Sequence, residues 1–313
     1  MNTNGGAGLD ANFVKPMIGI RHEFFLNHIV TSNHDIDYAF NIVNALPAIF
    51  PAKRLSTLSA EGKARLLSKW GEPLFLASWL RVLFIHFEVD AMELQRDVPF
   101  PLDLLDGRAY VSLVAFTMQD MRPRIGGKMT SWLLKPIATH EFLNVRTYVK
   151  SRGERGIYFL TEWLSNRLSV RLGPLLYGLP YRYAGITYRH PHEQRRVGGE
   201  LGGVVESGGG LGRFEYRGTF AGPEDFRPVE EDSLDEFLLE RYTAYTARGH
   251  TRRLFRIWHP SWPQIPMEVE IGDDSLLKNA WPWFTGARLV GANYSPGFRD
   301  VWMGRAHRIC PRI

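Results

Sequence analysis

The segment at residues 178–188 constrains the fold more than any other part of this sequence. Gly178 can adopt the left-handed backbone conformation that ends a helix, and Pro180 prevents the helix from resuming. The residues that follow are rich in aromatic and β-branched side chains, which favour a strand. The segment therefore predicts a helix end, a turn and a strand that begins with Tyr181 and Arg182. Barrels bind their ligands at such strand ends.

Residues 140–149 form the most regular strand pattern in the sequence. Every second residue from Leu143 onward belongs to one largely apolar face, and Asn144 and Arg146 share the other face. We therefore expect Asn144 and Arg146 to point in the same direction. The same alternation places Glu141 on the apolar face, so that it joins Arg146 only through a bulge or a later start of the strand.

The remaining pattern predicts a mainly β protein. Hairpin turns separate short strands, and there are too few long helices for repeated βαβ units. We expect one domain over residues 73–313, a closed or nearly closed, mainly antiparallel β-barrel with short helices packed outside it. The predicted strands are residues 79–87, 108–118, 140–149, 157–160, 181–188, 213–220, 288–294 and 301–303.

Residues 1–72 are predicted to be an N-terminal extension, partly disordered and then helical. Apolar residues recur at helical spacing over residues 35–46 and 60–70, and Ser32 and Ser59 are candidate N-caps. We expect this extension to pack on the barrel or on a partner.

The turn at Gly178 and Pro180 resembles the active-site segment of the acetoacetate decarboxylases, in which a Gly-aromatic-Pro turn precedes two adjacent lysines. In that family the first lysine forms a Schiff base with the keto acid, and the second lowers the pKa of the first. Tyr181 and Arg182 occupy these positions here. The resemblance therefore implies the fold and the pocket, but a phenol cannot form the imine.

A second motif, Asn144-x-Arg146-x-Tyr148 with Glu141 just upstream, is similar to the signature of the YqjF-like family. That family is a branch of the same superfamily, and its function is unknown. The resemblance begins at Trp79 and continues nearly to the end of the chain. It implies that Asn144, Arg146 and Glu141 contribute to the site.

Arg146 is a candidate for binding a substrate carboxylate, because its planar guanidinium can form two parallel hydrogen bonds with that group. The alternative is a structural ion pair with Glu141 or Glu162. Arg182 stands where the superfamily keeps a second cation. Arg81 lies close to the position of a substrate-binding arginine of the decarboxylases, and the resemblance makes it a further candidate.

Two functions remain open at this point. In an enzyme of lyase or isomerase type, Arg146 and Arg182 would bind an anionic metabolite, Asn144 would orient it, and Tyr181 would donate a proton if Arg182 lowered the pKa of its phenol. In a non-catalytic binding barrel the same residues would hold a ligand that does not react. Both hypotheses name a small-molecule ligand as the partner.

No cofactor or metal is predicted. The sequence has no phosphate-binding glycine loop or dinucleotide fingerprint. His190 and His192 have a spacing that can bind a metal, but with no third ligand in view a surface loop is the preferred interpretation. Lys128, Lys135 and Lys150 are the alternatives for a relocated Schiff-base amine.

The charge and cysteine content exclude some classes. The net charge of +5 is spread along the chain, which indicates a solvated basic surface and no nucleic-acid partner. Cys310 is the only cysteine, so no intrachain disulfide can form. A chain without disulfides is compatible with a reducing compartment. We expect a cytoplasmic protein without a membrane anchor, because no signal peptide is visible and the longest apolar run, residues 73–87, contains Arg81. A homo-oligomer is left open.

Overall fold

The structure is a computed structural model that describes residues 56–191, 199–220 and 225–309. The helix expected at residues 35–46 and its candidate cap Ser32 lie outside the described residues.

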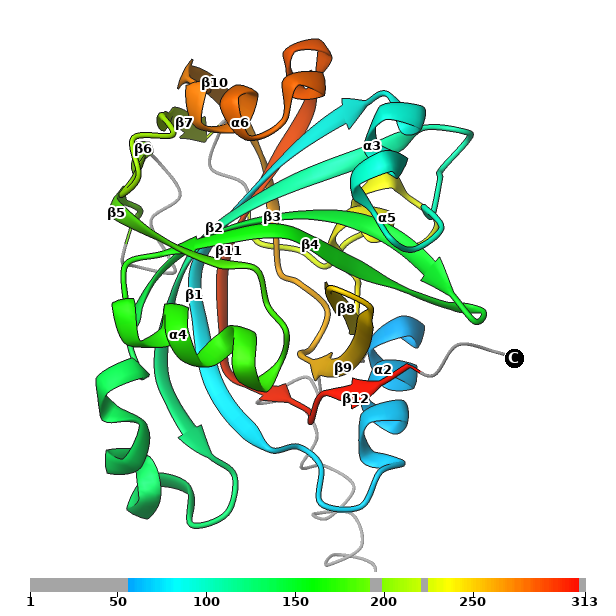
Figure 1. Ribbon diagram of the computed structural model, residues 1–313, viewed down its shortest axis with the longest axis vertical. Coiled ribbons are helices and arrows are strands. Elements are labelled where there is room, and N and C mark those ends of the chain that lie inside the picture. The colour runs from blue at the N-terminus through cyan, green and yellow to red at the C-terminus, as the bar shows by residue number, and fades with distance from the viewer. Residues whose placement is uncertain (1–55, 192–198, 221–224, 310–313) are drawn as a thin grey trace, which may run out of the picture. The chain divides into compact units, whose positions relative to one another are not determined.

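The described residues are mainly β (Figure 1). The strands are β1 (Phe75–Val89), β2 (Ala109–Pro123), β3 (His140–Ser151), β4 (Glu154–Leu164), β5 (Tyr181–Arg189), β6 (Glu200–Ser207), β7 (Arg213–Phe220), β8 (Thr243–Arg248), β9 (Thr251–Trp258), β10 (Ile265–Asp273), β11 (Arg288–Met303) and β12 (His307–Arg308). The α-helices are α2 (Thr57–Leu67), α3 (Ala91–Asp97), α4 (Arg167–Leu176), α5 (Leu234–Leu239) and α6 (Ser275–Ala280). Two 3₁₀ helices complete the description, η1 (Gly127–Ile137) and η2 (Pro282–Gly286).

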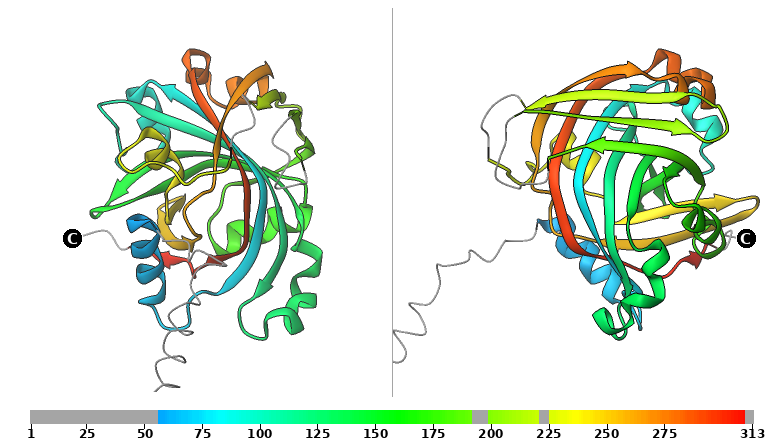
Figure 2. Two further views of the ribbon diagram at one scale, coloured as in Figure 1. Left: turned by 180° about the vertical axis from the view of Figure 1, so that it is seen from behind. Right: turned by 90° about the vertical axis from the view of Figure 1, so that its left-hand side faces the viewer.

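The strands form one sheet in the order β12-β9-β8-β4-β3-β2-β1-β11-β10-β7-β6-β5, and additional pairings join β9 to β11 and β4 to β5. These pairings close two rings of strands that share the wall β4-β3-β2-β1-β11 (Figure 2). The small ring is completed by β8 and β9, and the large ring by β10, β7, β6 and β5. Most pairs are antiparallel, and β4 pairs in parallel with β5 and β8. The predicted closed, mainly antiparallel sheet with peripheral helices is confirmed.

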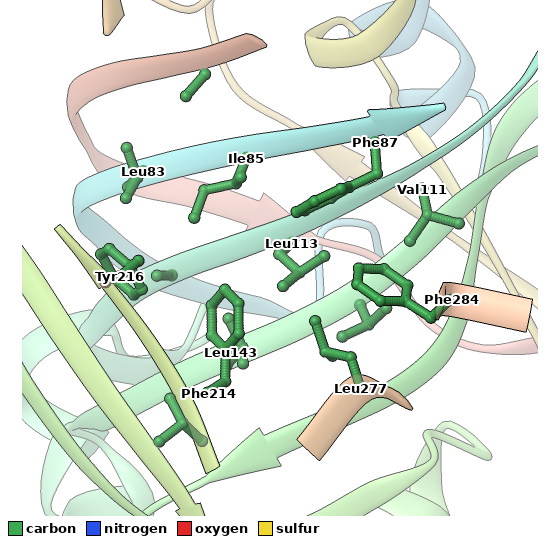
Figure 3. Close-up of a cluster of buried hydrophobic side chains, with 14 of the residues drawn as sticks. Leu83, Ile85, Phe87, Val111, Leu113, Leu143, Phe214, Tyr216, Leu277 and Phe284 are labelled. Carbon is green, nitrogen blue, oxygen red and sulfur yellow. The ribbon is translucent and has the colours of Figure 1, made fainter. Parts of the chain in front are cut away.

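Side chains of the shared wall alternate between two hydrophobic cores, as the period of a strand requires. From β1, Leu83 and Ile85 enter the core of the large ring, which also contains Phe214 of β7 (Figure 3). Phe84, between them in sequence, enters the core of the small ring together with Phe255 of β9. Both faces of the wall are therefore buried.

The helix α2 packs on β9. Its N-cap is Ser56, whose side chain accepts a hydrogen bond from the backbone N–H of Ser59. The prediction of Ser59 as the cap was wrong because the Ser59 hydroxyl is directed to the sheet, where it donates to the carbonyl oxygen of His259 at 2.9 Å. Trp258 of β9 donates its indole N–H to the Ser59 carbonyl oxygen at 3.1 Å.

The predicted helix end, turn and strand at residues 178–188 are confirmed. The helix α4 ends at Leu176, Gly178 has a φ of 73°, and β5 begins at Tyr181. Gly173 of α4 lies against the ring of Tyr181, where a β-carbon would come within 2.3 Å of the ring carbons. The helix therefore covers the start of β5. No helix in the described part of the chain is long and apolar enough to cross a bilayer.

Candidate functional site

Polar side chains gather on the face of β3 that points into the small ring. Asn144, Arg146 and Tyr148 are all more than nine-tenths buried there. The expectation that Asn144 and Arg146 point the same way agrees with this arrangement. Their neighbours on the same face, such as Phe142, belong to the apolar core of the small ring.

Arg146 is a buried cation with few hydrogen bonds. Its Nη2 donates to the carbonyl oxygen of Leu238, at the end of α5, at 3.1 Å, and its guanidinium lies 5.5 Å from the ring centroid of Phe84. Burial lowers its pKa, but the guanidinium of an arginine stays protonated in proteins. Its Nε has no hydrogen-bond partner among the described residues.

Glu162 of β4 lies opposite Asn144 in the strand register and is 4% exposed. Burial raises the pKa of its carboxyl group well above the ordinary value, although the nearby charge of Arg146 acts in the opposite direction. The protonated, neutral form is therefore favoured. Its Oε2 also has no partner within the described part of the chain.

Tyr181 lies beside Glu162, with which it pairs in the parallel register of β4 and β5. Its ring meets Phe142 edge-on at 5.9 Å. Burial raises the pKa of the Tyr181 phenol well above 10, and Glu162 and Tyr177 add to this effect. The Tyr181 hydroxyl is therefore suited to donate a hydrogen bond and is a poor acid.

The expectation that Arg182 lowers the pKa of Tyr181 was wrong. Adjacent residues of a strand point to opposite faces, so Arg182 points away from the Tyr181 side, and it is exposed. The structure does not bring Arg182 together with Arg146.

A chain of hydrogen bonds supports the site from the neighbouring strands. His86 contacts the Ser112 hydroxyl at 2.6 Å through Nδ1 and the Asn293 Oδ1 at 3.1 Å through Nε2. Asn293 Nδ2 donates to Gln264 Oε1 at 2.8 Å, so the Oδ1 of Asn293 is the atom that faces His86. Because this oxygen can only accept a hydrogen bond, the ring proton of His86 is on Nε2. The Ser112 hydroxyl also contacts the Tyr148 hydroxyl at 2.5 Å.

The histidines around Arg146 are neutral. Burial and the charge of Arg146 lower the pKa of His86 to about 3. Burial lowers the pKa of His259 to about 4. The charge of Arg146 also lowers this pKa, whereas a hydrogen bond to the Pro260 backbone raises it. The pKa shifts of Glu162 and of these histidines therefore disfavour charged forms of all three groups beside Arg146.

Several buried polar atoms on this side of the wall have no hydrogen-bond partner in the described part of the chain. Native structures contain few such atoms, and each one calls for an explanation. They are Asn144 Oδ1, Arg146 Nε, Glu162 Oε2, and both ring nitrogens of His140. We call Asn144, Arg146, Glu162 and Tyr181 the Arg146 site.

The structure places Glu141 on the opposite face of β3. The register between β2 and β3 is continuous from Thr147 to His140, so no bulge turns Glu141 toward Arg146. Its Oε2 accepts a hydrogen bond from the Ser165 hydroxyl at 2.8 Å.

Arg81 also lies apart from Arg146. It has a φ of 57° at an irregularity in β1, and its Nη2 donates to the Thr117 hydroxyl at 2.8 Å. Its charge acts on His190 and Tyr294, which line the large ring. The structure thus does not bring Arg81 and Glu141 together with Arg146.

His190 is buried, so the surface-loop interpretation was wrong for this residue; His192 lies outside the described residues. The ring of His190 stacks on Tyr188 at 4.9 Å, and its Nε2 contacts the Tyr216 hydroxyl at 2.7 Å. In the described ranges no group of three or more His, Cys, Asp or Glu residues could hold a metal ion.

Lys128, Lys135 and Lys150 are all exposed. No lysine is buried among the residues that the structure describes.

From the sequence, Glu162 was expected only as a counterion of Arg146, and Tyr148 and His86 were not expected in the site. Glu162 was hard to place because the pairing of β3 and β4 shifts between Val145 and Arg146. That shift changes which residues of β4 face the small ring, and its signal lies in the partner strand and not in the local sequence.

The closed, mainly antiparallel sheet is that of an acetoacetate decarboxylase-like fold. The structure is similar to an acetoacetate decarboxylase-like enzyme from Sphingomonas wittichii RW1, with a TM-score of 0.52 and 18% identity over 76% of this chain and 94% of that one. It is also similar to the enduracididine biosynthesis enzyme MppR, with a TM-score of 0.55 and 14% identity over 76% of this chain and 88% of that one. At these identities the likeness shows the fold alone.

The chain belongs to the DUF2071 family, whose description is "uncharacterized conserved protein" and whose model matches residues 76–290. It is 29% identical to the uncharacterized protein YqjF of Bacillus subtilis strain 168 over 207 residues, which is 64% of this chain and 78% of the relative. The resemblance to the YqjF-like family is therefore confirmed.

Proposed function

We propose that the Arg146 site binds a small molecule that carries a carboxylate. The observation that carries this proposal is the buried guanidinium of Arg146, whose neighbours Glu162 and His86 have pKa values shifted toward their neutral forms. A buried charge without a counterion is costly, so a bound anion would offset that cost. The unpartnered Nε of Arg146 is a donor for such an anion.

The neutral groups of the site suit the rest of the ligand. Protonated Glu162 and the Tyr181 hydroxyl can both donate hydrogen bonds, and the unpartnered Oδ1 of Asn144 can accept one. A small acid with a carbonyl or hydroxyl group close to its carboxylate fits this set. Pyruvate is a suitable first probe, because MppR, which shares the fold, has been solved in complex with pyruvate.

A thermal-shift series with matched ligands and variants tests the binding. The ligands are pyruvate, acetoacetate and malonate, with pyruvamide as the uncharged control. In Arg146→Met an apolar side chain of similar length replaces the buried guanidinium. Arg182→Met is the matched control for an exposed arginine.

We expect at least one of the acids, and not pyruvamide, to raise the Tm of the wild type and of Arg182→Met. The same acid should leave the Tm of Arg146→Met unchanged. Equal stabilisation of both variants would contradict the proposal, because the acid would then bind elsewhere.

A lyase-like or isomerase-like reaction is the second candidate, and the raised pKa of Glu162 favours it. A carboxyl group with a raised pKa is, in its ionised form, a stronger base that can remove a proton from the carbon beside a carbonyl and then return one to it. NMR of the bound acid in D₂O tests this. Deuterium incorporation beside the carbonyl that disappears in Glu162→Gln indicates proton transfer, and no incorporation indicates binding alone.

A further inference from the structure

Large apolar side chains are exposed on two neighbouring segments, neither of which contains a residue of the Arg146 site. One segment is η1 with the turn before it, and the other is α4 (Figure 1). Asn166 at the start of α4 donates its side-chain N–H to the carbonyl oxygen of Pro136 in η1 at 2.8 Å, which joins the two. We call the exposed side chains the η1–α4 patch: Ile125, Met129, Trp132, Leu133, Leu168, Leu175 and Leu176.

The degree of exposure is unusual for side chains of this kind. Met129 is 87% exposed, Ile125 84% and Trp132 68%. Single exposed apolar residues are common on proteins, but a group of this size on adjacent segments marks an interaction surface. Most of the surface of the Ile125 and Met129 side chains is therefore open to solvent.

Positive charges predominate around the patch. Residues 121–139 and 165–178 contain no aspartate or glutamate. The cations of these segments are Arg122, Arg124, Lys128, Lys135, Arg167 and Arg171. A groove of about 920 Å³ beside η1 is lined by four cations and by Asp120 and Asp300, and Trp132 also lines it. Even there, positive charges outnumber negative ones.

This combination favours one occupant. Two copies that met through the same patch would place like charges opposite each other, which is unfavourable. Protruding apolar side chains and a tryptophan beside lysines and arginines are typical of segments that lie in the interface of a membrane. Anionic headgroups attract such basic surfaces.

We propose that the η1–α4 patch binds the surface of an anionic phospholipid bilayer. Ile125, Met129 and Trp132 enter the interfacial layer, and Lys128 and Lys135 contact headgroup phosphates. The expectation from the sequence that no membrane takes part rested on the lack of a long apolar run, a criterion that does not detect surface binding. This proposal is independent of the ligand of the Arg146 site.

Flotation of the full-length protein with vesicles tests the proposal. One set of vesicles is phosphatidylcholine alone, and the other contains phosphatidylglycerol as well. The triple variant Ile125→Ser, Met129→Ser, Trp132→Ser removes the apolar contacts. The matched control is the double variant Trp70→Ser, Met92→Ser, which replaces residues that are 98% and 75% exposed elsewhere on the chain.

We expect the wild type and the control to float with the phosphatidylglycerol vesicles and not with phosphatidylcholine alone. The triple variant should lose this binding. Lys128→Gln with Lys135→Gln should weaken the partitioning by roughly thirtyfold at low salt. No binding of the wild type, or unchanged binding of the triple variant, would overturn the proposal. A wild-type dimer that the triple variant dissociates in sedimentation equilibrium would also overturn it, because the patch would then be an interface between copies.

Discussion

Replacing Glu162 by glutamine should stabilise the protein increasingly as the pH rises from about 4.5. Burial raises the pKa of the Glu162 carboxyl in the folded protein, whereas in the unfolded chain that pKa is near 4.3. The stability that the protonated group contributes is therefore fully present below about pH 4.3 and is lost as the pH rises through the folded-state pKa. Glutamine has nearly the same shape and cannot ionise.

The magnitude follows from the linkage of protonation to folding. Between the unfolded and folded pKa values, each pH unit costs the wild type about 1.4 kcal/mol of stability that the variant keeps. The difference in the free energy of unfolding between Glu162→Gln and wild type should thus rise with that slope and level off at the folded-state pKa. In an Arg146→Met background the rise should continue to a higher pH, because the charge of Arg146 lowers the pKa of Glu162.

Urea denaturation at half-unit steps from pH 4 to pH 8 measures this difference. A difference that is constant with pH would show that Glu162 titrates alike in the folded and unfolded states. A variant that loses stability relative to the wild type with rising pH would show that Glu162 is ionised and paired with Arg146. Either result would refute the neutral environment of Arg146.

Three further predictions concern the packing and the chemistry of the strand start. Gly173→Ala should cost about 1–3 kcal/mol in urea denaturation, because the new β-carbon meets the Tyr181 ring. Gly297→Ala should cost more than Gly173→Ala, because the φ of Gly297 is 88° and the new β-carbon would lie 1.9 Å from the Trp79 carbonyl oxygen. Gly291→Ala is the control, because no atom lies within 4 Å of its β-carbon position. Equal losses of stability in all three variants would refute this packing. Acetoacetate with borohydride should leave the mass of the wild type unchanged, because no described lysine is buried. The variant Tyr181→Lys should gain a reduced adduct in the same experiment. An adduct on the wild type would show that another amine reacts.

Features set by neighbouring residues could be predicted from the sequence. The alternation of β3 fixed the common direction of Asn144 and Arg146, because the side-chain period of a strand is local. Gly178 and Pro180 likewise determine the end of α4 and the start of β5 through their own backbone preferences. Closure of the sheet followed from the number and spacing of the strands together with the resemblance to the family.

Features set by distant residues could not be predicted. Whether Arg81 and Arg146 share a site depends on which ring each face of the wall enters, and that is decided by strands far along the chain. The burial of His190 depends on Tyr216 of β7. The position of Glu162 depends on the shifted register between β3 and β4. No local pattern of residues carries this information.

A crystal structure of the protein with the small acid that raises its Tm most is the most direct test of the proposed site. We expect a carboxylate oxygen within hydrogen-bond distance of the Arg146 guanidinium, with the rest of the acid beside Glu162 and Tyr181. An ordered acid bound against Arg81 and His190 in the large ring, with none at Arg146, would contradict the proposed function.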